Sequence, residues 1–281
     1  MSDNPAKSLE PAIPRPAATV LILRDGRHGI EVFMVVRHHE IDFATGAMVF
    51  PGGKVDGDDS AGVWDRLAPP GPGPSRAFEV AALRETFEEA GLLLARRRGA
   101  SGLIAPDEAQ AIVGLHRADT ALAGHAARNG ARAFAQVIEK EGLTLATDLL
   151  VHFAHWITPL HSPKRFDTHF YLVAAPVDQV GLHDGTESVE GVWIAPAQAL
   201  AEAASGRRTL VPATSLNLEK LARYGSVEER VAATRSAPVV TVCPEVRRRA
   251  DGGRSLIIPI EAGYGTSDYY VPAERRTASP S

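Results

Sequence analysis

Three glutamates whose spacing matches the turn of a helix are the residues of this chain best suited to chemistry. Glu85, Glu88 and Glu89 stand at positions i, i+3 and i+4, so they fall on one face of any α-helix that carries them. Carboxylates this close repel one another unless a cation neutralises them. Hard oxygen ligands select Mg²⁺ or Mn²⁺ over zinc, and the cluster therefore indicates a site for one of these ions. A solvated acidic helix face is the alternative.

A pair of glycines lies upstream of the glutamates. Residues 47–50 form an apolar run, and Gly52 and Gly53 follow it after a single proline. Because glycine has no side chain, the backbone at such a pair can approach a ligand or a metal closely. A tight turn explains the same two residues, and both explanations can hold together.

These two segments together resemble the Nudix box, written G-x5-E-x7-R-E-U-x-E-E-x-G-U, in which U is an aliphatic residue. The matching residues are Gly53, in the sequence FPGGKVD, and the run RETFEEAGL at 84–92. The alignment places Asp59 where the family has glutamate, and Thr86 where it has an aliphatic residue. The resemblance implies a hydrolase of nucleoside diphosphates that are linked to another group.

The spacing inside the box departs from the family pattern. Residues 60–83 separate Asp59 from Arg84, which is 24 residues where the pattern has seven. Prolines and glycines alternate over residues 69–74, and such a composition cannot continue a helix or a central strand. We therefore expect an insertion at 60–76 that bulges outward as a loop, at an entropic cost of only ~0.6 kcal/mol per doubling of length. An insertion at this point is similar to that of the Nudix branch that contains the coenzyme A and acyl-CoA diphosphatases.

The resemblance also implies roles for the residues of the box. It implies that the metal ligands and catalytic residues are Glu85, Glu88 and Glu89, with the carbonyl oxygen of Gly52 as a further ligand. Gly53 and Arg84 have supporting roles. Because Arg84 directly precedes Glu85, we expect its guanidinium to orient the acidic side chains through charge-assisted hydrogen bonds and not to contact the substrate.

The general base stays open, because Nudix enzymes take it either from the box helix or from a later loop. Glu85 and Glu89 are the candidates within the box. Glu187 and Glu190 are candidates for the base or for an extra metal ligand, since they lie just before or within the strand that leads to Trp193.

Basic residues outside the box are candidates for binding the phosphates of the substrate. Lys164 and Arg165 stand in an expected loop, and Arg37 stands at the end of an early strand. Phe166 and Trp156 are available to pack against an adenine base, although Trp156 is more typical of a core residue. The sequences WITP at 156–159 and KRFDT at 164–168 again resemble the CoA-hydrolysing branch.

Strand and helix patterns indicate how the box is positioned. Two β-rich runs at 18–23 and 32–36 flank a polar turn with two glycines and predict a hairpin. Residues 77–90 predict the helix of the glutamates, which Ser75 can cap and Gly91 can end in a left-handed conformation. The other expected elements are strands at 47–50, 149–158, 168–174 and 189–194, and a terminal helix at 197–204.

We expect one elaborated domain of the α/β class. The resemblance implies an α/β/α sandwich around a mixed β-sheet. The expected divisions are a flexible leader at 1–16, a Nudix domain at 17–205 with a helical insertion at 106–145, and a C-terminal extension at 206–281. Alanine-rich helical spacing predicts two or three helices in the helical insertion, which could form a lid or a homodimer contact. Runs at 239–243 and 256–260, joined across Asp251-Gly252-Gly253, suggest a C-terminal hairpin.

The composition narrows the partners and the location. With 30 basic and 34 acidic residues among 281 and a net charge of −4, the chain has no general attraction to nucleic acid. The single cysteine, Cys243, excludes a disulfide framework and fits a reducing compartment, so the cytoplasm is the expected location. We expect no membrane segment, because no apolar stretch is long enough to span a bilayer. Ten histidines are present without an H-E-x-x-H pattern, which disfavours zinc catalysis.

The expected function is Mg²⁺- or Mn²⁺-dependent hydrolysis of a small nucleotide-linked diphosphate. The resemblance favours CoA or acyl-CoA as the substrate, with adenosine 3′,5′-bisphosphate and a phosphopantetheine as products. ADP-ribose, NADH or a nucleotide sugar is the alternative within the same chemistry. A Nudix module that binds a nucleotide without cleaving it is the alternative of another class, although such a module is expected to have lost the three glutamates that this chain retains.

Overall fold

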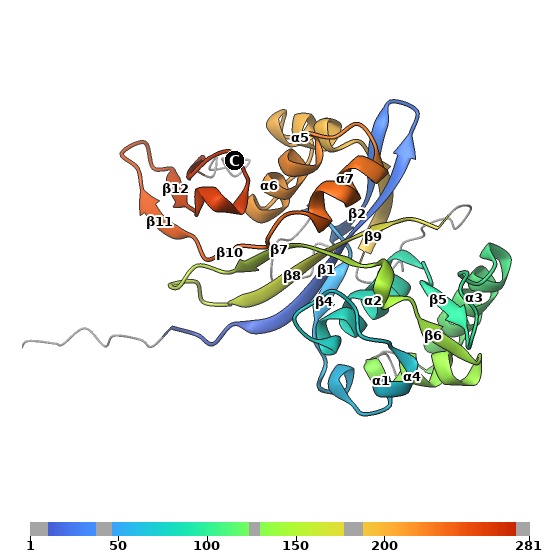
Figure 1. The fold of residues 1–281 in the computed structure, drawn as a ribbon. Helices are drawn as coiled ribbons and strands as arrows, with labels where there is room; N and C mark the ends of the chain where they lie inside the picture. Colours follow the sequence, from blue (N-terminus) through green and yellow to red (C-terminus); the bar gives the residue numbers. More distant parts are fainter. Residues whose placement is uncertain (1–10, 38–46, 124–129, 177–187, 274–281) are drawn as a thin grey trace, which may run out of the picture.

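A mixed β-sheet forms the centre of the computed structural model, which describes residues 11–37, 47–123, 130–176 and 188–273. Within this part of the chain, eight strands pair in the order β10-β7-β8-β1-β2-β3, with β4 also beside β1 and β9 also beside β2 (Figure 1). Its strands are β1 (Arg15–Gly26), β2 (Gly29–Arg37), β3 (Met48–Val49), β4 (Gly52–Lys54), β7 (Val151–Ile157), β8 (Phe166–Ala174), β9 (Ser188–Ile194) and β10 (Thr241–Val242).

Strand β1 changes partner along its length, and this change fixes the position of the glycine pair. On one side β1 runs parallel to β8 from residue 15 to residue 23. On the other side its first half pairs with β4, where Thr19 is opposite Gly52, and its second half pairs with β2, where Leu23 is opposite Val32. The predicted hairpin of the first two strands is present. The glycine pair is part of β4 and lies beside the point where β1 changes its partner from β4 to β2.

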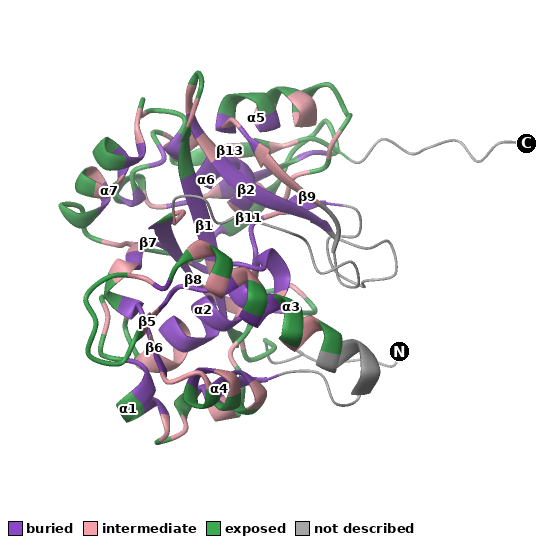
Figure 2. Ribbon diagram, turned by 90° about the vertical axis from the view of Figure 1, so that its right-hand side faces the viewer, coloured by how far each residue is buried: buried purple, intermediate pink, exposed green. Residues whose placement is uncertain are grey.

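Helices cover both faces of the sheet, as the α/β/α prediction required (Figures 1 and 2). Successive residues of β1 alternate between two cores: Val20 and Ile22 pack on the side of α2, whereas Leu21 and Leu23 pack on the side of α6. This period of two, apolar on both faces, is expected of a strand buried between two layers. One layer contains α1 (Trp64–Leu67), α2 (Arg76–Ala90), α3 (Pro106–Ala123) and α4 (Ala131–Lys140), with the strand pair β5 (Ala95–Arg97) and β6 (Leu143–Leu145). The other contains α5 (Pro196–Ala204), α6 (Pro212–Leu221) and α7 (Val227–Arg235).

Helix α2 carries the three glutamates and lies close to its predicted limits. It ends at Gly91, whose φ of 63° is left-handed, as predicted for a glycine at this position. Ser75 occupies the N-cap position, but its side chain accepts no hydrogen bond from the first turn. The prediction that Ser75 caps the helix through its side chain was therefore wrong.

The insertion at 60–76 is not simply a loop that bulges outward, which corrects the sequence prediction. Within it, α1 buries Trp64 and Leu67, and the indole of Trp64 packs 5.9 Å from the ring of Phe134 in α4. The proline-glycine segment that follows is held by the buried carboxylate of Glu79, which accepts hydrogen bonds from two backbone N–H groups in that segment. The prolines exclude long helices and strands, but the short helix α1 forms before them and contributes to the core.

The helical insertion agrees with its prediction in the part that the structure describes. Helices α3 and α4 fall within residues 106–145. After α4 the chain returns through β6, which pairs antiparallel with β5. Alanine-rich spacing therefore predicted the right kind of element here.

Both ends of the described chain are more closely joined to the sheet than the sequence predicted. Strand β1 already begins at Arg15, so the end of the expected leader at residue 16 was misplaced. Helices α6 and α7 follow α5, which is not the terminal helix, and Leu216, Ile258 and Tyr264 share one core with the sheet. Residues 206–273 are therefore built into the domain, with no core of their own.

The C-terminal hairpin exists, but its first strand was placed wrongly. Residues 241–242 form β10 and pair parallel with β7 in the central sheet. The hairpin consists of β11 (Glu245–Arg248) and β12 (Arg254–Ile257), and β13 (Asp268–Val271) makes it a three-stranded sheet. Pro244 separates β10 from β11, so the predicted run at 239–243 belongs to the central sheet and the first strand of the hairpin begins after it. No helix among the described residues has the length and apolar character needed to cross a membrane.

Candidate active site

The glycine pair and the glutamates of α2 meet directly. The backbone N–H of Gly52 donates a hydrogen bond of 2.9 Å to Oε2 of Glu89. The carboxylate of Glu85 lies against Gly53 so closely that a Cβ atom at residue 53 would be 2.6 Å from Cδ of Glu85. Any side chain at this position would push the carboxylate away, which explains why glycine is needed here.

Arg84 connects the two halves of the box through its hydrogen bonds. Its guanidinium is 5% exposed and donates to both carboxylate oxygens of the fully buried Asp59, at 3.1 and 3.0 Å. It also donates to Glu85 at 2.7 Å, to Glu88 at 3.1 Å and to the carbonyl oxygen of Lys54 at 3.0 Å. Burial lowers the pKa of Arg84, but the surrounding carboxylates outweigh burial and raise it above its usual value. These are the contacts with acidic side chains that the sequence predicted for Arg84.

Asp59 closes the insertion at its base. The backbone N–H of Asp56 donates to Oδ2 of Asp59 at 2.7 Å, in addition to the two bonds from Arg84. Because the paired side chains are on either side of the insertion, the 24 intervening residues leave the geometry of the box intact. The shorter aspartate in place of the usual glutamate still forms a bidentate pair with the arginine.

Glu88 shows the electrostatic character of a cation site. Burial raises its pKa to about 7, the charge of Glu85 adds to this rise, and Arg84 opposes it. Its Oε1 atom is buried and has no hydrogen-bond partner among the described residues. A buried unpaired carboxylate oxygen is unusual in proteins, and here it lies in a cluster of oxygen donors suited to Mg²⁺ or Mn²⁺. The residues of the site therefore fit the ion that the sequence predicted.

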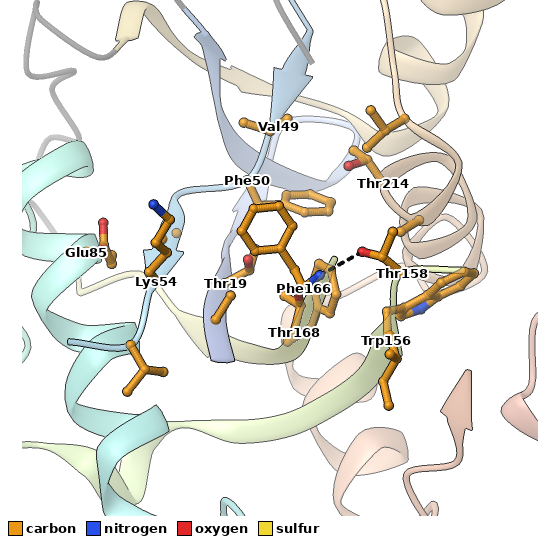
Figure 3. A pocket seen from close by; sticks show the side chains of 18 of the residues that line it. Thr19, Val49, Phe50, Lys54, Glu85, Trp156, Thr158, Phe166, Thr168 and Thr214 are labelled. Atoms are coloured by element: carbon orange, nitrogen blue, oxygen red, sulfur yellow. Dashed lines mark hydrogen bonds between the residues drawn. The ribbon is translucent and has the colours of Figure 1, made fainter. Parts of the chain in front are cut away.

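A cavity of about 940 Å³ extends from the glutamates across the sheet (Figure 3). In Figure 3, Glu85 and Lys54 lie at one end and Trp156, Thr158 and Thr214 lie at the other. Between them Phe50 and Phe166 form an apolar middle, and the N–H of Phe166 is bonded to Oγ1 of Thr158 at 3.0 Å. A long site with charge at one end and apolar surface beyond it suits a ligand that has a charged part joined to an apolar part.

The far wall of the cavity comes from the C-terminal part of the chain. Val246, Arg254 and Leu256, on β11 and β12, line it together with the first turn of α6. Neither these residues nor Lys54 were singled out from the sequence. Lys54 follows the glycine pair directly, so its position was a usable signal, whereas nothing local marks the residues of β11 and β12.

The position of Arg165 does not support the role that the sequence suggested. Its guanidinium is buried and donates to the carbonyl oxygens of Thr158 and Ala12, at 3.0 and 2.8 Å. Arg165 does not line the cavity; it ties the segment before β1 to the start of β8. These contacts do not support the prediction that Arg165 meets phosphate, because Nε and Nη1 of its guanidinium already donate to backbone carbonyls. Lys164 is exposed and also lies outside the cavity lining.

Three further candidates are placed only in part. The backbones of Arg37 and Glu190 lie in the paired strands β2 and β9, near the point where their register shifts. Their side chains, and the whole of Glu187, are outside the described part of the chain, so their roles stay predictions. Trp156 is buried, as expected of a core residue, and its Nε1 donates to the hydroxyl of Tyr264 at 2.7 Å; it also lines the cavity.

Comparisons with known proteins agree with the fold and the site. The family model of the NUDT19 Nudix domain matches residues 72–221, which is more than half of the chain. Putative nudix hydrolase 7 of Caenorhabditis elegans is 29% identical over 209 residues, which cover 71% of this chain and 61% of that protein. Acyl-coenzyme A diphosphatase NUDT19 of Gallus gallus is 27% identical over 239 residues, covering 71% of this chain and 63% of that protein. The chain thus spans about three fifths of the length of these two relatives.

A solved structure supports the same assignment. The crystal structure of a NUDIX hydrolase from Alicyclobacillus acidocaldarius is 29% identical, with a TM-score of 0.65, and covers 80% of this chain and 99% of that one. The chain therefore belongs to the Nudix hydrolases, a family of enzymes that act on diphosphate bonds. Within that family it falls in the branch of the acyl-CoA diphosphatases. The family match runs to residue 221, past the limit of 205 that the sequence predicted for the Nudix domain.

Proposed function

We propose that this protein hydrolyses the diphosphate of CoA or acyl-CoA with the help of Mg²⁺ or Mn²⁺. The products are adenosine 3′,5′-bisphosphate and phosphopantetheine or its acyl derivative. The observation that carries the proposal is the shape of the cavity, in which the box carboxylates at one end continue into a lining of Phe50, Phe166, Trp156 and Leu256. A phosphate-rich nucleotide joined to a long, partly apolar arm has the same division.

The site residues would hold the ion and orient the reacting groups. Glu85, Glu88 and Glu89 are the ligands we assign, with the carbonyl oxygen of Gly52 as a further donor. When bound, the divalent ion makes a ligated water more acidic and neutralises the charge of the diphosphate oxygens. Arg84 keeps Glu85 and Glu88 in position through hydrogen bonds of 2.7 and 3.1 Å.

The bond changes in the reaction are those of a hydrolysis. The water oxygen forms a bond to one phosphorus, the bond from that phosphorus to the bridging oxygen breaks, and the second phosphate leaves with the electron pair. A carboxylate takes the proton from the water. Glu85 and Glu89 are the candidates within the box, and Glu187 and Glu190 are the candidates outside it. Lys54 lies where its positive charge can balance the phosphates at this end of the cavity.

The cytoplasm is the location we propose for this activity. Cys243 is the single cysteine of the chain and is exposed. A lone exposed thiol suits a reducing compartment.

A substrate panel tests the proposal. Purified protein is incubated with Mg²⁺ or Mn²⁺ and, separately, with CoA, acetyl-CoA, a long-chain acyl-CoA, ADP-ribose, NADH and a nucleotide sugar, and the products are resolved by mass. Release of adenosine 3′,5′-bisphosphate from the CoA compounds, with little turnover of the others, supports the proposal. Preference for ADP-ribose, NADH or the sugar would overturn the CoA assignment, and no turnover of any substrate would favour a binding module.

The variant Glu88→Gln tests the metal site in the same assay. We expect a loss of at least about 100-fold in kcat, since the variant removes a charged ligand at the reacting end. The matched control is Glu228→Gln on α7, where the glutamate is exposed and does not line the cavity. Full activity in Glu88→Gln would show that the ion is held elsewhere.

A further inference from the structure

A second cluster of metal-binding side chains lies on the opposite face of the sheet from the cavity. His155 of β7 and His169 of β8 stand directly opposite each other, and Asp167 is two residues before His169 on the same face of β8. Phe166, Thr168 and Phe170 of β8 line the cavity, so the residues between them point to the other side. The two imidazole rings are stacked, with centroids 3.9 Å apart and planes within 12°.

The ligand atoms of this cluster lie close together. Nε2 of His155 is 2.5 Å from Oδ1 of Asp167, and Nε2 of His169 is 3.9 Å from the same oxygen. One ligand atom from each of the three residues lies within 4.8 Å of the others. In a tetrahedral zinc site with bonds of about 2.0–2.1 Å, the ligand atoms are separated by about 3.3 Å. The observed separations bracket this value, and the two stacked rings would have to tilt out of parallel for both Nε2 atoms to face one ion.

Each histidine also has a partner on its other ring nitrogen. Nδ1 of His155 is 2.8 Å from Oγ1 of Thr241 in β10, and Nδ1 of His169 is 2.9 Å from Nε2 of His152. Without an ion, the 2.5 Å contact between Nε2 of His155 and Asp167 holds a proton. A bound cation would displace that proton, and the Nδ1–H groups would keep their partners while Nε2 of each ring binds the ion. Metal-ligating histidines are almost always oriented in this way by a hydrogen bond on the second nitrogen.

We propose that His155, His169 and Asp167 bind one zinc-type divalent cation, in a site separate from the Nudix box. Two imidazole nitrogens and one carboxylate favour zinc over magnesium, whereas the donors of the box are all oxygens. The side chain of Asp167 is 33% exposed and those of the histidines 16% and 8%. This exposure leaves water access to a fourth coordination position.

The position of the site gives the ion a structural role. It would link β7 to β8, and through Thr241 it would steady β10, which joins the sheet from far along the chain. The reverse face of the same strands carries Trp156, Thr168 and Phe170, which line the cavity. The bound ion would therefore stiffen the wall of the active site without taking part in the reaction.

The test measures zinc binding and not activity. Protein without a histidine tag is stripped with chelator, equilibrated with Zn²⁺ in the presence of excess Mg²⁺, and analysed for metal content and for affinity by competition with a zinc-binding dye. We expect one zinc per chain, and a rise in Tm on zinc addition. His155→Gln and His169→Gln should each lose this zinc and the rise in Tm, while Thr241→Ala should bind about 10- to 100-fold more weakly.

Two controls make the result decisive. His161→Ala removes an exposed histidine from the loop between the same two strands and should bind zinc like the unaltered chain. Glu88→Gln alters the box and should keep the zinc. If stripped protein takes up no zinc, or if zinc uptake survives both His155→Gln and His169→Gln, the proposed site is overturned. Neither outcome bears on the turnover of CoA, so this proposal can fail while the proposed function stands.

Discussion

Arg84 makes a set of contacts in the box that a lysine could not reproduce. Its flat guanidinium pairs with both oxygens of Asp59 while reaching Glu85, Glu88 and the carbonyl oxygen of Lys54. Lysine has one ammonium group and cannot form the bidentate pair. The residue thus combines two tasks, closing the base of the insertion and aligning the acidic ligands.

We predict that Arg84→Lys destabilises the protein by about 2–3 kcal/mol, the range for hydrogen bonds lost to buried charged groups. We also expect kcat to fall, because Glu85 and Glu88 lose their alignment. Urea unfolding monitored by circular dichroism and steady-state kinetics measure the two effects. The control is Arg66→Lys, whose ion pair with Glu139 is exposed and should change stability by less than about 1 kcal/mol. Equal stability of the two variants would show that the buried pair contributes nothing specific.

The raised pKa of Glu88 predicts how stability depends on pH when no ion is bound. The folded pKa is about 7 and the usual value is 4.5, so the folded chain holds a proton that the unfolded chain has released. The stabilisation from this proton is complete below pH 4.5 and is lost as pH rises through 7; it amounts to about 3 kcal/mol at most. Divalent ions bind the ionised form and should offset this loss.

The measurement is the free energy of unfolding in chelator between pH 5 and 8, for the unaltered chain and for Glu88→Gln. Glutamine does not titrate, so the gap between the two curves should change by up to about 3 kcal/mol over this range. Adding Mg²⁺ should stabilise the unaltered chain more at pH 8 than at pH 5. Parallel curves in chelator would show that Glu88 titrates normally.

At the scale of elements, the insertion within the box is the clearest departure from what composition indicates. Helix α1 buries Trp64 against Phe134 of α4, so a segment that reads as a loop joins two parts of the core. We predict that Trp64→Ala destabilises the protein by about 3–5 kcal/mol, as for other buried aromatic residues. Pro72→Ala, in the exposed part of the same insertion, should cost no more than about 1 kcal/mol. Thermal and urea unfolding of both variants provide the comparison. A small effect of Trp64→Ala would show that the insertion acts as a surface loop and does not contribute to the core.

The elements that the sequence predicted are those with a local cause. The first hairpin, helix α2 and the two helices of the 106–145 insertion each follow from apolar spacing and from glycine positions within the element. Helix α6 was missed because its stabilisation comes from a distance: the hydroxyl of Tyr264 donates to Oδ1 of Asn217 at 2.8 Å across the core. Without Tyr264, a buried asparagine argues against a helix that packs on a sheet.

The residues of the candidate site likewise separate into those that the sequence could predict and those that only the fold brings together. The glutamates and Arg84 are close in the sequence, and the glycine pair upstream is matched to them by family resemblance. Arg165 shows the limit, because a guanidinium satisfied by backbone carbonyls has the same sequence signature as one that awaits a phosphate. Arg254 and Val246 could not be found, since only the fold brings them to the cavity.

At the scale of the whole molecule, the C-terminal sheet should set the selectivity for acyl chains. Val246 lines the cavity and is 43% exposed, so it can be changed without opening the core. We predict that Val246→Asp lowers kcat/KM for a long-chain acyl-CoA by about 10-fold or more, the cost of placing a charge beside an apolar arm. Turnover of free CoA should change much less. This prediction depends on the proposed substrate.

Ile260→Asp is the matched control for that prediction. Ile260 is 52% exposed and does not line the cavity, so the same change of chemistry there should leave both substrates unaffected. Competition between long-chain acyl-CoA and CoA in one reaction, with products resolved by mass, measures the ratio directly. An unchanged ratio in Val246→Asp would place the acyl chain elsewhere in the cavity.

The shared cavity also sets an order of events during synthesis of the chain. The last box glutamate, Glu89, is made 167 residues before Leu256 of the far wall, an interval on the order of ten to thirty seconds at common translation rates. Until β10 emerges, β7 is an open sheet edge that can pair with other chains. A nascent chain at this stage would carry the three box glutamates without a complete substrate site. The exposed edge of β7 is where a chaperone would be of most use.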